Sequence, residues 1–299
     1  MRILFSAVFL CCVALSGAET FSFARPVRTG ELFECRIRLS RSARYAFTLP
    51  GRNEPVVKLD TAEADFHGFL LVREVNAAGN PVRLLIRRCL FSGSLDGRAV
   101  EAITGASPEI EADLSGKESA FSCAGRALSS GQLALLRQLF PPVSSLTLGD
   151  LAGRSRVLPK AGEGWKPDLK PFLDQLKQRR IELPSSAFSG WITYLGKEKT
   201  GGLDCRKFTL RIETAGLTDY DCRYRFSFLL APSGPPVRMT LDAVEVIRQV
   251  LRSGEPMSAG TILELIQQDQ LEQSLTPVSE VPPPETGKKQ PGTWDFLLR

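Results

Sequence analysis

The sequence predicts an α+β protein that is mainly antiparallel β, with two units of curved sheet joined by a helical segment and followed by a C-terminal helix. Three observations predict this class. Apolar and polar residues alternate in the first third of the chain and again beyond residue 190, which is typical of half-buried strands. Apolar residues recur at helical spacing between residues 129 and 180 and near residue 265. Clusters of Gly, Pro, Asn and Asp separate these runs, as turns require.

The start of the chain has the features of a secretory signal peptide. Arg2 supplies a positive charge, residues 3–15 are apolar apart from Ser6, and Ser16-Gly17-Ala18 places small residues at the cleavage site. We therefore expect a signal peptide over residues 1–18 and a mature chain from Glu19. The apolar run is shorter than the roughly 20 residues that span a bilayer, although an uncleaved N-terminal anchor is the alternative. No second long apolar run follows, so we expect a secreted or periplasmic protein with no transmembrane segment after cleavage.

The N-terminal β-rich unit is predicted to cover residues 19–128. In its first strand Phe33, Cys35, Ile37 and Leu39 share one face, and charged residues occupy the other. Turn-forming residues at 50–53, 76–80 and 94–97 separate the strands that follow. The predicted strands of this unit are residues 32–39, 45–49, 56–59, 69–75, 82–91 and 107–114.

A helical connecting segment is predicted over residues 129–184. Ser129 or Ser130 is a suitable helix N-cap, and Leu133, Leu136 and Phe140 recur at helical spacing before two prolines end the helix. Residues 149–167 are rich in Gly and Pro and predict a loop. A second helix is expected over residues 168–180, with Pro171 in its first turn, where the missing N–H is tolerated.

The C-terminal β-rich unit is predicted to cover residues 185–275, with a Pro-rich flexible tail over 276–299. Strands are expected at residues 190–196, 205–213, 222–231 and 237–241, whereas 244–251 fits either a strand or a helix. Ile262, Leu265, Ile266 and Leu271 predict an amphipathic helix over 258–274. Residues 79–84 also resemble residues 234–239, through either duplication of a β-unit or chance similarity of turns.

Composition and charge exclude few functions. The chain is 43% hydrophobic and 24% charged, as globular proteins usually are. Its net charge of +5 falls to +4 when Arg2 is removed (5 − 1), and the basic residues do not cluster. Because nucleic-acid binding needs a concentrated basic surface, we expect no nucleic-acid partner.

Five cysteines remain after residue 18, an odd number that leaves at least one thiol outside any intramolecular disulfide. An oxidising compartment allows disulfides. The candidate pairs are Cys205 with Cys222, on neighbouring predicted strands, and Cys35 with Cys89, which would leave Cys123 free. The alternative is that all five are buried thiols. The absence of C-x-x-C argues against thioredoxin-like redox chemistry and a zinc ribbon.

Residues 63–67 carry the one candidate metal site. Glu63, Asp65 and the single histidine, His67, alternate and would share a face of a strand, where they could hold a divalent cation. A solvent-facing strand explains the same pattern, because metal ligands usually converge from several elements. We expect no cofactor.

Other catalytic motifs lack their partner residues. Lys199-Thr200-Gly201 occurs in penicillin-binding serine enzymes, but no Ser-x-x-Lys accompanies it here. Asp219 and Asp221 are a possible carboxylate pair for glycoside hydrolysis, although acids this close in sequence usually form a polar turn.

The runs WITYLGKE at 191–198, GGLDC at 201–205 and FTL at 208–210, together with LFSGSLDG at 90–97, resemble exported bacterial β-rich proteins of unknown function. Some of these resemble the lipoprotein-carrier type of curved sheet around an apolar groove. The resemblance covers about residues 31–243. It implies a fold and a cell-envelope location, and it transfers no catalytic residue.

These observations favour an exported, non-enzymatic binding module for an apolar small molecule or another envelope protein. The candidate ligand-binding residues are Trp191, Tyr194, Phe226 and Phe228. The full set expected to line the interior, or simply to pack there, is Phe33, Ile37, Leu71, Leu84, Trp191, Tyr194, Phe208, Phe226 and Phe228. Two alternatives remain: a hydrolase that uses carboxylates or the Glu63/Asp65/His67 site, and a surface component that docks through the tail.

Overall fold

The computed structural model describes residues 19–104, 109–143, 146–178, 181, 183–214, 217–250 and 260–282. The helical elements are few and short, and the strands dominate. In chain order the elements are β1 (Thr20–Ser22), β2 (Leu32–Thr48), β3 (Val56–Val75), β4 (Pro81–Leu95), β5 (Arg98–Ile103), β6 (Ile110–Asp113), β7 (Ala120–Cys123), α1 (Ser130–Leu139), α2 (Leu148–Ala152), β8 (Ser155–Val157), β9 (Gly164–Trp165), α3 (Lys170–Gln178), the 3₁₀ helix η1 (Ser185–Ala187), β10 (Phe188–Thr200), β11 (Leu203–Thr214), β12 (Tyr220–Leu230), β13 (Pro236–Val250) and β14 (Ile262–Pro277).

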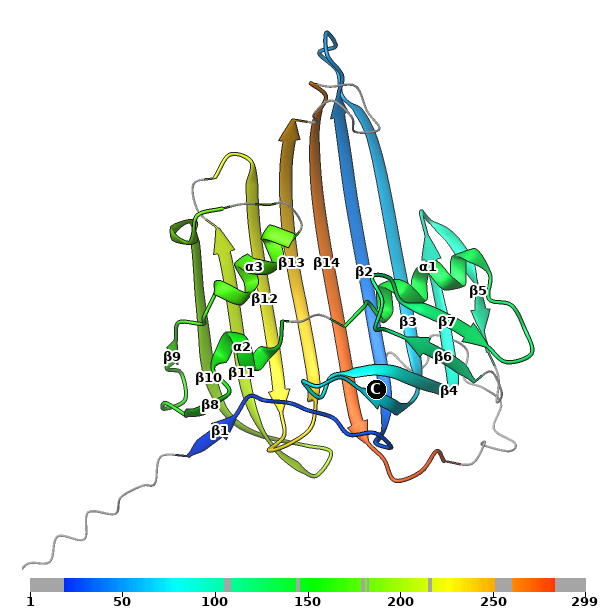
Figure 1. Ribbon diagram of the computed structural model, residues 1–299, viewed down its shortest axis with the longest axis vertical. Coiled ribbons are helices and arrows are strands. Elements are labelled where there is room, and N and C mark those ends of the chain that lie inside the picture. The colour runs from blue at the N-terminus through cyan, green and yellow to red at the C-terminus, as the bar shows by residue number, and fades with distance from the viewer. Residues whose placement is uncertain are drawn as a thin grey trace, which may run out of the picture.

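Among the described residues, 12 strands form one continuous antiparallel sheet in the order β7-β6-β4-β3-β2-β14-β13-β12-β11-β10-β9, with β5 also paired to β4. β1 and β8 form a separate two-stranded ribbon. The long strands β13, β14, β2 and β3 lie at the centre, and the ends of β2 and β3 project beyond the rest of the sheet (Figure 1). β14 pairs with β13 on one edge and with β2 on the other. It therefore joins the strands from the first half of the chain to those from the second half.

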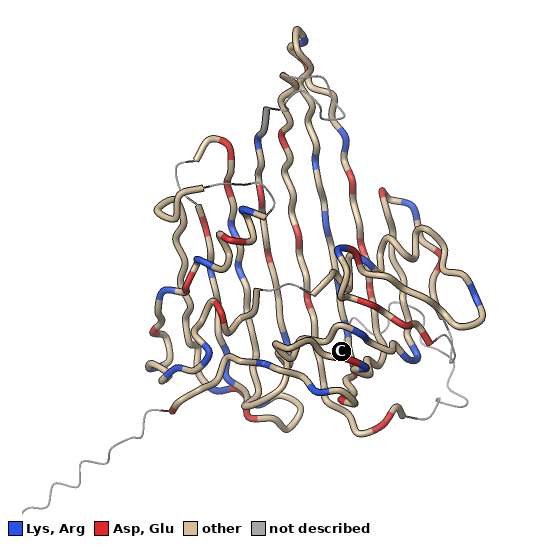
Figure 2. The backbone as a smooth tube through the Cα atoms, viewed as in Figure 1, with Lys and Arg blue, Asp and Glu red and all other residues tan. Residues whose placement is uncertain are grey.

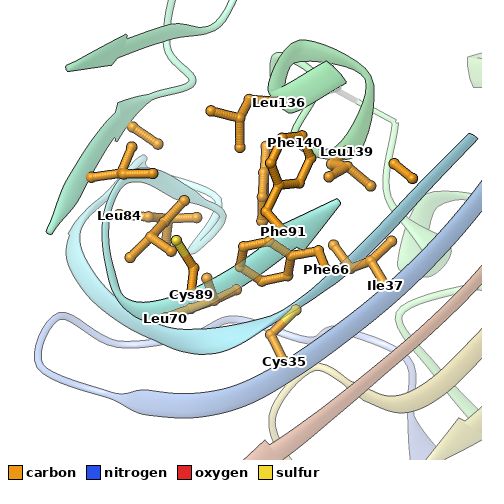
Figure 3. Packing of buried hydrophobic residues seen from close by; sticks show 14 of the residues in the cluster. Cys35, Ile37, Phe66, Leu70, Leu84, Cys89, Phe91, Leu136, Leu139 and Phe140 are labelled. Atoms are coloured by element: carbon orange, nitrogen blue, oxygen red, sulfur yellow. The ribbon is translucent and has the colours of Figure 1, made fainter. Parts of the chain in front are cut away.

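The three helices and the β1–β8 ribbon lie against one face of this sheet, which we name the covered face (Figure 1). Its first apolar cluster packs α1 against β2 to β6, with Phe66 and Phe140 in edge-to-face contact at 5.1 Å between ring centroids (Figure 3). Leu135 and Leu136 of α1 are fully buried in this cluster. Burial of such side chains is the main stabilising contribution in a sheet covered on one side.

A second cluster lies under α2, α3 and β1, over strands β10 to β13. Aromatic rings fill it: Phe23 contacts Phe208 at 5.1 Å and Trp165 at 5.7 Å between centroids, and Phe172 contacts Phe188 at 5.8 Å. The structure therefore has two large, separate cores on one sheet, besides a small cluster of Cys205, Leu229, Ala231 and Val237.

Strand β14 separates these two cores, and none of its side chains is buried. Its covered-face residue Asp269 instead pairs with Arg41 of β2, with 2.6 Å between Oδ1 and Nε. Polar side chains at this central position explain why the apolar clusters do not merge.

The opposite face, which we name the open face, is polar. It carries the alternate residues of each strand, and basic and acidic residues are interspersed along the long strands (Figure 2). Ion pairs join several of them across neighbouring strands: Arg38 to Asp65, Arg238 to Glu272, and Arg248 to Glu264. Such exposed pairs stabilise a sheet weakly, so this face is built for solvent or for a polar ligand.

The N-terminus of α1 confirms the predicted cap. Ser129 accepts a hydrogen bond from the Gln132 backbone N–H, and the Gln132 side chain accepts one from the Ser129 N–H at 2.9 Å, which completes a capping box. The second predicted helix is α3, and the predicted loop over 149–167 contains most of α2 together with β8 and β9.

The predicted α+β class with a C-terminal helix is wrong. Strands hold 57% of the described residues and helices 11%, so the protein is mainly β. Residues 262–277 form β14 rather than a helix, and the two predicted β-units share one sheet. The physical reason is that β14 is hydrogen-bonded on both edges, from Ile262 opposite Thr48 to Pro277 opposite Phe33 and along β13. Tertiary pairing of this kind overrides local periodicity.

Several predicted strands prove to be parts of longer ones. Residues 32–39 and 45–48 belong to β2, residues 56–59 and 69–75 belong to β3, and the ambiguous residues 244–250 belong to β13. The two similar segments at 79–84 and 234–239 lead into β4 and β13, each paired with the preceding strand. The duplication and the domain boundaries remain predictions.

Residues 1–18 and the end of the tail, 283–299, lie outside the described residues, so the signal peptide and tail docking remain predictions. Within the part of the chain that the structure describes, no helix has both the length and the apolar character needed to cross a membrane.

Candidate functional site

A groove of about 550 Å³ crosses the open face from β11 to β2. The strand register places its walls in two rows that run perpendicular to the strands. Arg211 lies opposite Arg225, Arg225 opposite Asp242, and Asp242 opposite Gln270. The next row is Thr209, Ser227, Thr240, Glu272 and Arg38. These side chains are polar, and Leu210, Phe226, Leu241 and Leu271 also line the groove.

The charges in the groove are uneven. Glu272 is paired with Arg238 and Arg38 is paired with Asp65. Among the described residues, the structure gives Arg211 and Arg225 no ion pair, although they lie on neighbouring strands in direct register. Two cations therefore occupy the β11–β12 end of the groove, with Asp242 as the nearest acid along the row.

The projecting end of β3 is a second candidate surface, at a free edge of the sheet. Pairing with β4 begins at Ala62 opposite Leu95. Thr61 directs its backbone outward: its N–H donates to Asp96 Oδ1 at 2.9 Å, and its C=O accepts from the Asp96 N–H at 2.8 Å. Because backbone direction alternates along an antiparallel strand, Leu59 and Val57 direct their N–H and C=O groups to the same edge. No described residue pairs with them there.

Apolar side chains surround this edge. Val56, Val57 and Leu59 are 54%, 49% and 59% exposed. Tyr45 and Phe47 of β2 lie half-buried beside them. An exposed, apolar, unpaired edge is a template for another strand, which most proteins avoid presenting. We name residues 56–60 of β3 the distal edge.

The predicted ligand-binding residues lie on different faces. Tyr194, Phe208 and Phe228 form one row across β10, β11 and β12 on the covered face, with 5.3 Å between the rings of Tyr194 and Phe208. Phe226 is half-buried and stacks on Phe228 at 5.7 Å. Trp191 is 46% exposed on the open face, where it lies opposite Arg211.

The remaining residues predicted to line the interior pack in the two cores. Phe33, Ile37 and Leu84 belong to the cluster under α1, and Phe208 belongs to the cluster under α2 and α3. Leu71 is half-buried. These positions are filled by core packing.

Glu63, Asp65 and His67 share the open face of β3. Asp65 pairs with Arg38 at 3.1 Å, and His67 Nε2 lies 2.9 Å from Glu34 Oε1. Partial burial of Glu34 would raise its pKa, but hydrogen bonds from Arg36 and His67 outweigh this and hold its pKa below the usual value. In the described part of the chain, no group of three such side chains is arranged to hold a metal ion.

Of the predicted carboxylate pair, Asp221 is engaged through its side chain and Asp219 through its backbone. Asp221 Oδ1 accepts a hydrogen bond from the Thr214 hydroxyl at 2.6 Å, and the Asp219 carbonyl accepts one from the Arg248 N–H at 2.8 Å. The arrangement is that of a polar strand end.

All five described cysteines are free thiols. Cys222 lies at the end of β12 that faces residue 214, whereas Cys205 lies at the other end of β11, so the structure does not bring this pair together. Cys35 lies opposite Gly68 on β3, and Cys89 lies beyond Gly68 on β4. Cys35 and Cys89 therefore belong to the same cluster but are two strands apart (Figure 3). Burial raises the pKa of Cys35 to about 12 and of Cys89 to about 11.

Sequence reasoning missed both candidate surfaces. The opposition of Arg211 and Arg225 depends on strand register, which residue types alone do not reveal. The sequence does contain a sign of the distal edge, because three of the four residues Val56-Val57-Lys58-Leu59 are apolar. Only the end of the β3–β4 pairing at Ala62 shows that this run has no neighbouring strand on its β4 side.

No family model and no curated protein significantly matches the chain. Among solved structures, one described as lipid–protein interactions in lipovitellin matches with a TM-score of 0.28 and 9% sequence identity. The match covers 88% of this chain and 27% of that one, so this chain spans about a quarter of its length. The β-rich character expected from the sequence is confirmed, whereas the likeness to lipoprotein carriers remains a prediction.

Proposed function

We propose that this is an exported, non-enzymatic binding protein that captures an extended segment of another envelope protein. The distal edge is the observation that carries this proposal. Val57 and Leu59 present unpaired backbone groups between exposed apolar side chains. Strand addition uses this combination, because backbone hydrogen bonds give affinity and alternate side chains give specificity.

The unpaired backbone groups favour a peptide over a lipid at this surface. Burying an N–H or C=O in hydrocarbon without a partner costs several kcal/mol. A strand satisfies these groups while it covers Val57 and Leu59. Lys58 lies in the middle of the edge, with Nζ 2.9 Å from Asp60 Oδ1. A charged residue of this kind limits indiscriminate pairing of edges.

The export part of the proposal rests on the signal-peptide pattern of residues 1–18. The binding part does not depend on catalysis, and the geometry of Glu63, Asp65 and His67 offers the hydrolase alternative no support. A bound segment of five or more residues would continue the sheet beyond β3, in line with β4.

Site-specific photocrosslinking in an exporting bacterial host tests the proposal. A photoreactive residue at Val57 should crosslink to an envelope protein, whereas the same residue at exposed Lys117 should not. With the purified partner, the Val57 and Leu59 amides should become protected from hydrogen exchange.

Two substitutions separate backbone pairing from side-chain contact. Leu59→Pro removes the outward N–H at an edge position where proline is tolerated, and it should abolish both crosslinking and protection. Leu59→Thr keeps the backbone groups and should weaken binding only partly. Crosslinks to lipid alone, or equal binding by Leu59→Pro, would overturn the proposal.

A further inference from the structure

Several arginines of the open face are ion-paired, whereas Arg211, Arg225 and the neighbouring Arg223 have no ion pair among the described residues. Arg36, Arg38, Arg238 and Arg248 each have a carboxylate within 4 Å. Arg211 and Arg225 instead oppose each other across β11 and β12, and no described carboxylate forms an ion pair with either. Like charges directly opposite each other destabilise a sheet, so folding alone does not account for the pair.

The groove beside this pair has a floor of hydroxyl groups. Thr193, Thr209, Ser227 and Thr240 lie in register across β10, β11, β12 and β13. Thr209, Ser227 and Thr240 line the groove and are half-buried. Each hydroxyl can both donate and accept a hydrogen bond. Asp242 and Gln270, further along the row of the two arginines, add a carboxylate and an amide.

We infer that this groove binds a sugar or similar polyhydroxylated small molecule that carries a carboxylate or phosphate group. The guanidinium groups of Arg211 and Arg225 bind the anion, since their planar donors match the oxygens of both groups. The hydroxyl row, Gln270 and Asp242 bind the hydroxyl groups of the ligand. This site is separate from the distal edge and does not depend on it.

The groove excludes other ligand classes by its chemistry. Its volume of about 550 Å³ falls in the range of small-molecule sites, roughly 300–1,000 Å³. Asp242 and Glu272 would repel the successive phosphates of a nucleic-acid strand, which needs a continuous basic surface.

Calorimetric titration of the protein, residues 19–299, tests the inference with four probes: glucuronate, glucose 6-phosphate, glucose and inorganic phosphate. Glucuronate and glucose 6-phosphate should bind, and their affinity should exceed that of glucose by about tenfold or more. The affinity for both acidic sugars should fall as salt is added, because salt screens charges in an exposed groove.

Substitutions identify the groups involved. Arg225→Gln and Arg211→Gln should each weaken glucose 6-phosphate binding at least about tenfold, as expected for a charge-assisted hydrogen bond. Thr240→Val should weaken the sugar phosphate but not inorganic phosphate. Arg248→Gln is the matched control on the same face, away from the groove and paired with Glu264, and it should bind normally.

Three results would overturn the inference. No binding of either acidic sugar would exclude the site, and equal binding by Arg225→Gln and the parent protein would exclude the arginine pair. Equal affinity for inorganic phosphate and glucose 6-phosphate would exclude sugar recognition. Leu59→Pro should leave all these titrations unchanged, so failure here is distinguishable from failure at the distal edge.

Discussion

The hydroxyl of Tyr220 donates a hydrogen bond to Oε1 of Glu245 over 2.9 Å, and both side chains are buried. Tyr220 is part of the second core. Tyr220 also packs against Phe188, with 6.2 Å between the ring centroids. A carboxyl group in such surroundings is tolerated only when hydrogen bonds replace the water it has lost. The pair is therefore a polar connection between β12 and β13 inside an apolar cluster.

Tyr220→Phe should lower the free energy of unfolding by about 1–3 kcal/mol, the usual cost of removing one partner of a buried polar group. The ring is retained, so packing against Phe188 is not lost. Urea denaturation followed by circular dichroism measures the change. Thr193→Val, on the open face of β10, serves as a control and should have an effect below about 0.5 kcal/mol. If Tyr220→Phe left the free energy of unfolding unchanged, the hydrogen bond would make no net contribution to stability.

Stability should decline at alkaline pH because four buried groups resist ionisation. Burial raises the pKa of Cys35 to about 12, of Cys89 to about 11 and of Cys222 to about 11, and it raises the pKa of Tyr220 above its usual value. These groups ionise more readily in the unfolded chain, where the thiol pKa is near 9.0. Their contribution is complete below pH 9 and is lost as pH rises through the folded values.

Thermal unfolding between pH 7 and pH 11 checks this sign. The melting temperature should be level up to about pH 8.5 and fall above it. A triple variant, Cys35→Ala, Cys89→Ala and Cys222→Ala, should have a lower melting temperature but a shallower alkaline decline. An equal decline in that variant would assign the effect to other groups.

The free thiols should differ in reactivity. Cys123 is the one partly exposed thiol among the five described, and the others are buried. We expect a thiol reagent to modify Cys123 rapidly in the native protein and all five thiols after denaturation. The thiolate is the reactive form, and burial both hides the other thiols and raises their pKa. If only three thiols react in the denatured, unreduced protein exported by a bacterial host, one of the two candidate disulfides has formed.

The sequence predicts local features of this fold better than its long-range pairing. Ser129 and Gln132 interact within one turn, so their capping box is visible as a motif. The predicted alternation of buried and exposed residues from Phe33 to Leu39 is also observed, because β2 has one buried and one solvated face. Each of these patterns depends on neighbours in the chain.

The pattern fails where both faces of a strand have similar surroundings. β14 lies between the two cores with no buried side chain, so Ile262, Leu265 and Ile266 do not alternate and are spaced as in a helix. The candidate sites could not be predicted from the sequence for a related reason. Arg211 and Arg225 are 14 positions apart in sequence (225 − 211), and only the pairing of β11 with β12 sets them opposite each other.

The continuous sheet predicts that both cores unfold together. β14 is paired with β2 along its whole length and with β13 from Arg238 to Val250, so losing either core exposes hydrogen bonds of the other half. Leu135→Ala in the first core and Ile192→Ala in the second should each cost about 2–5 kcal/mol, as large-to-small substitutions at fully buried positions do. Both should lower the midpoint of one shared transition.

Urea unfolding monitored at two positions tests this cooperativity. In a variant with Trp191 and Trp294 replaced by Phe, fluorescence of Trp165 reports the second core. A fluorophore attached to Cys123, with the other cysteines replaced, reports the first core. Coincident transitions in the parent, shifted equally by Leu135→Ala, are expected for a two-state sheet. If Leu135→Ala shifted only the Cys123 signal, the cores would unfold independently, and β14 would act as a boundary between two units rather than as the strand that unites them.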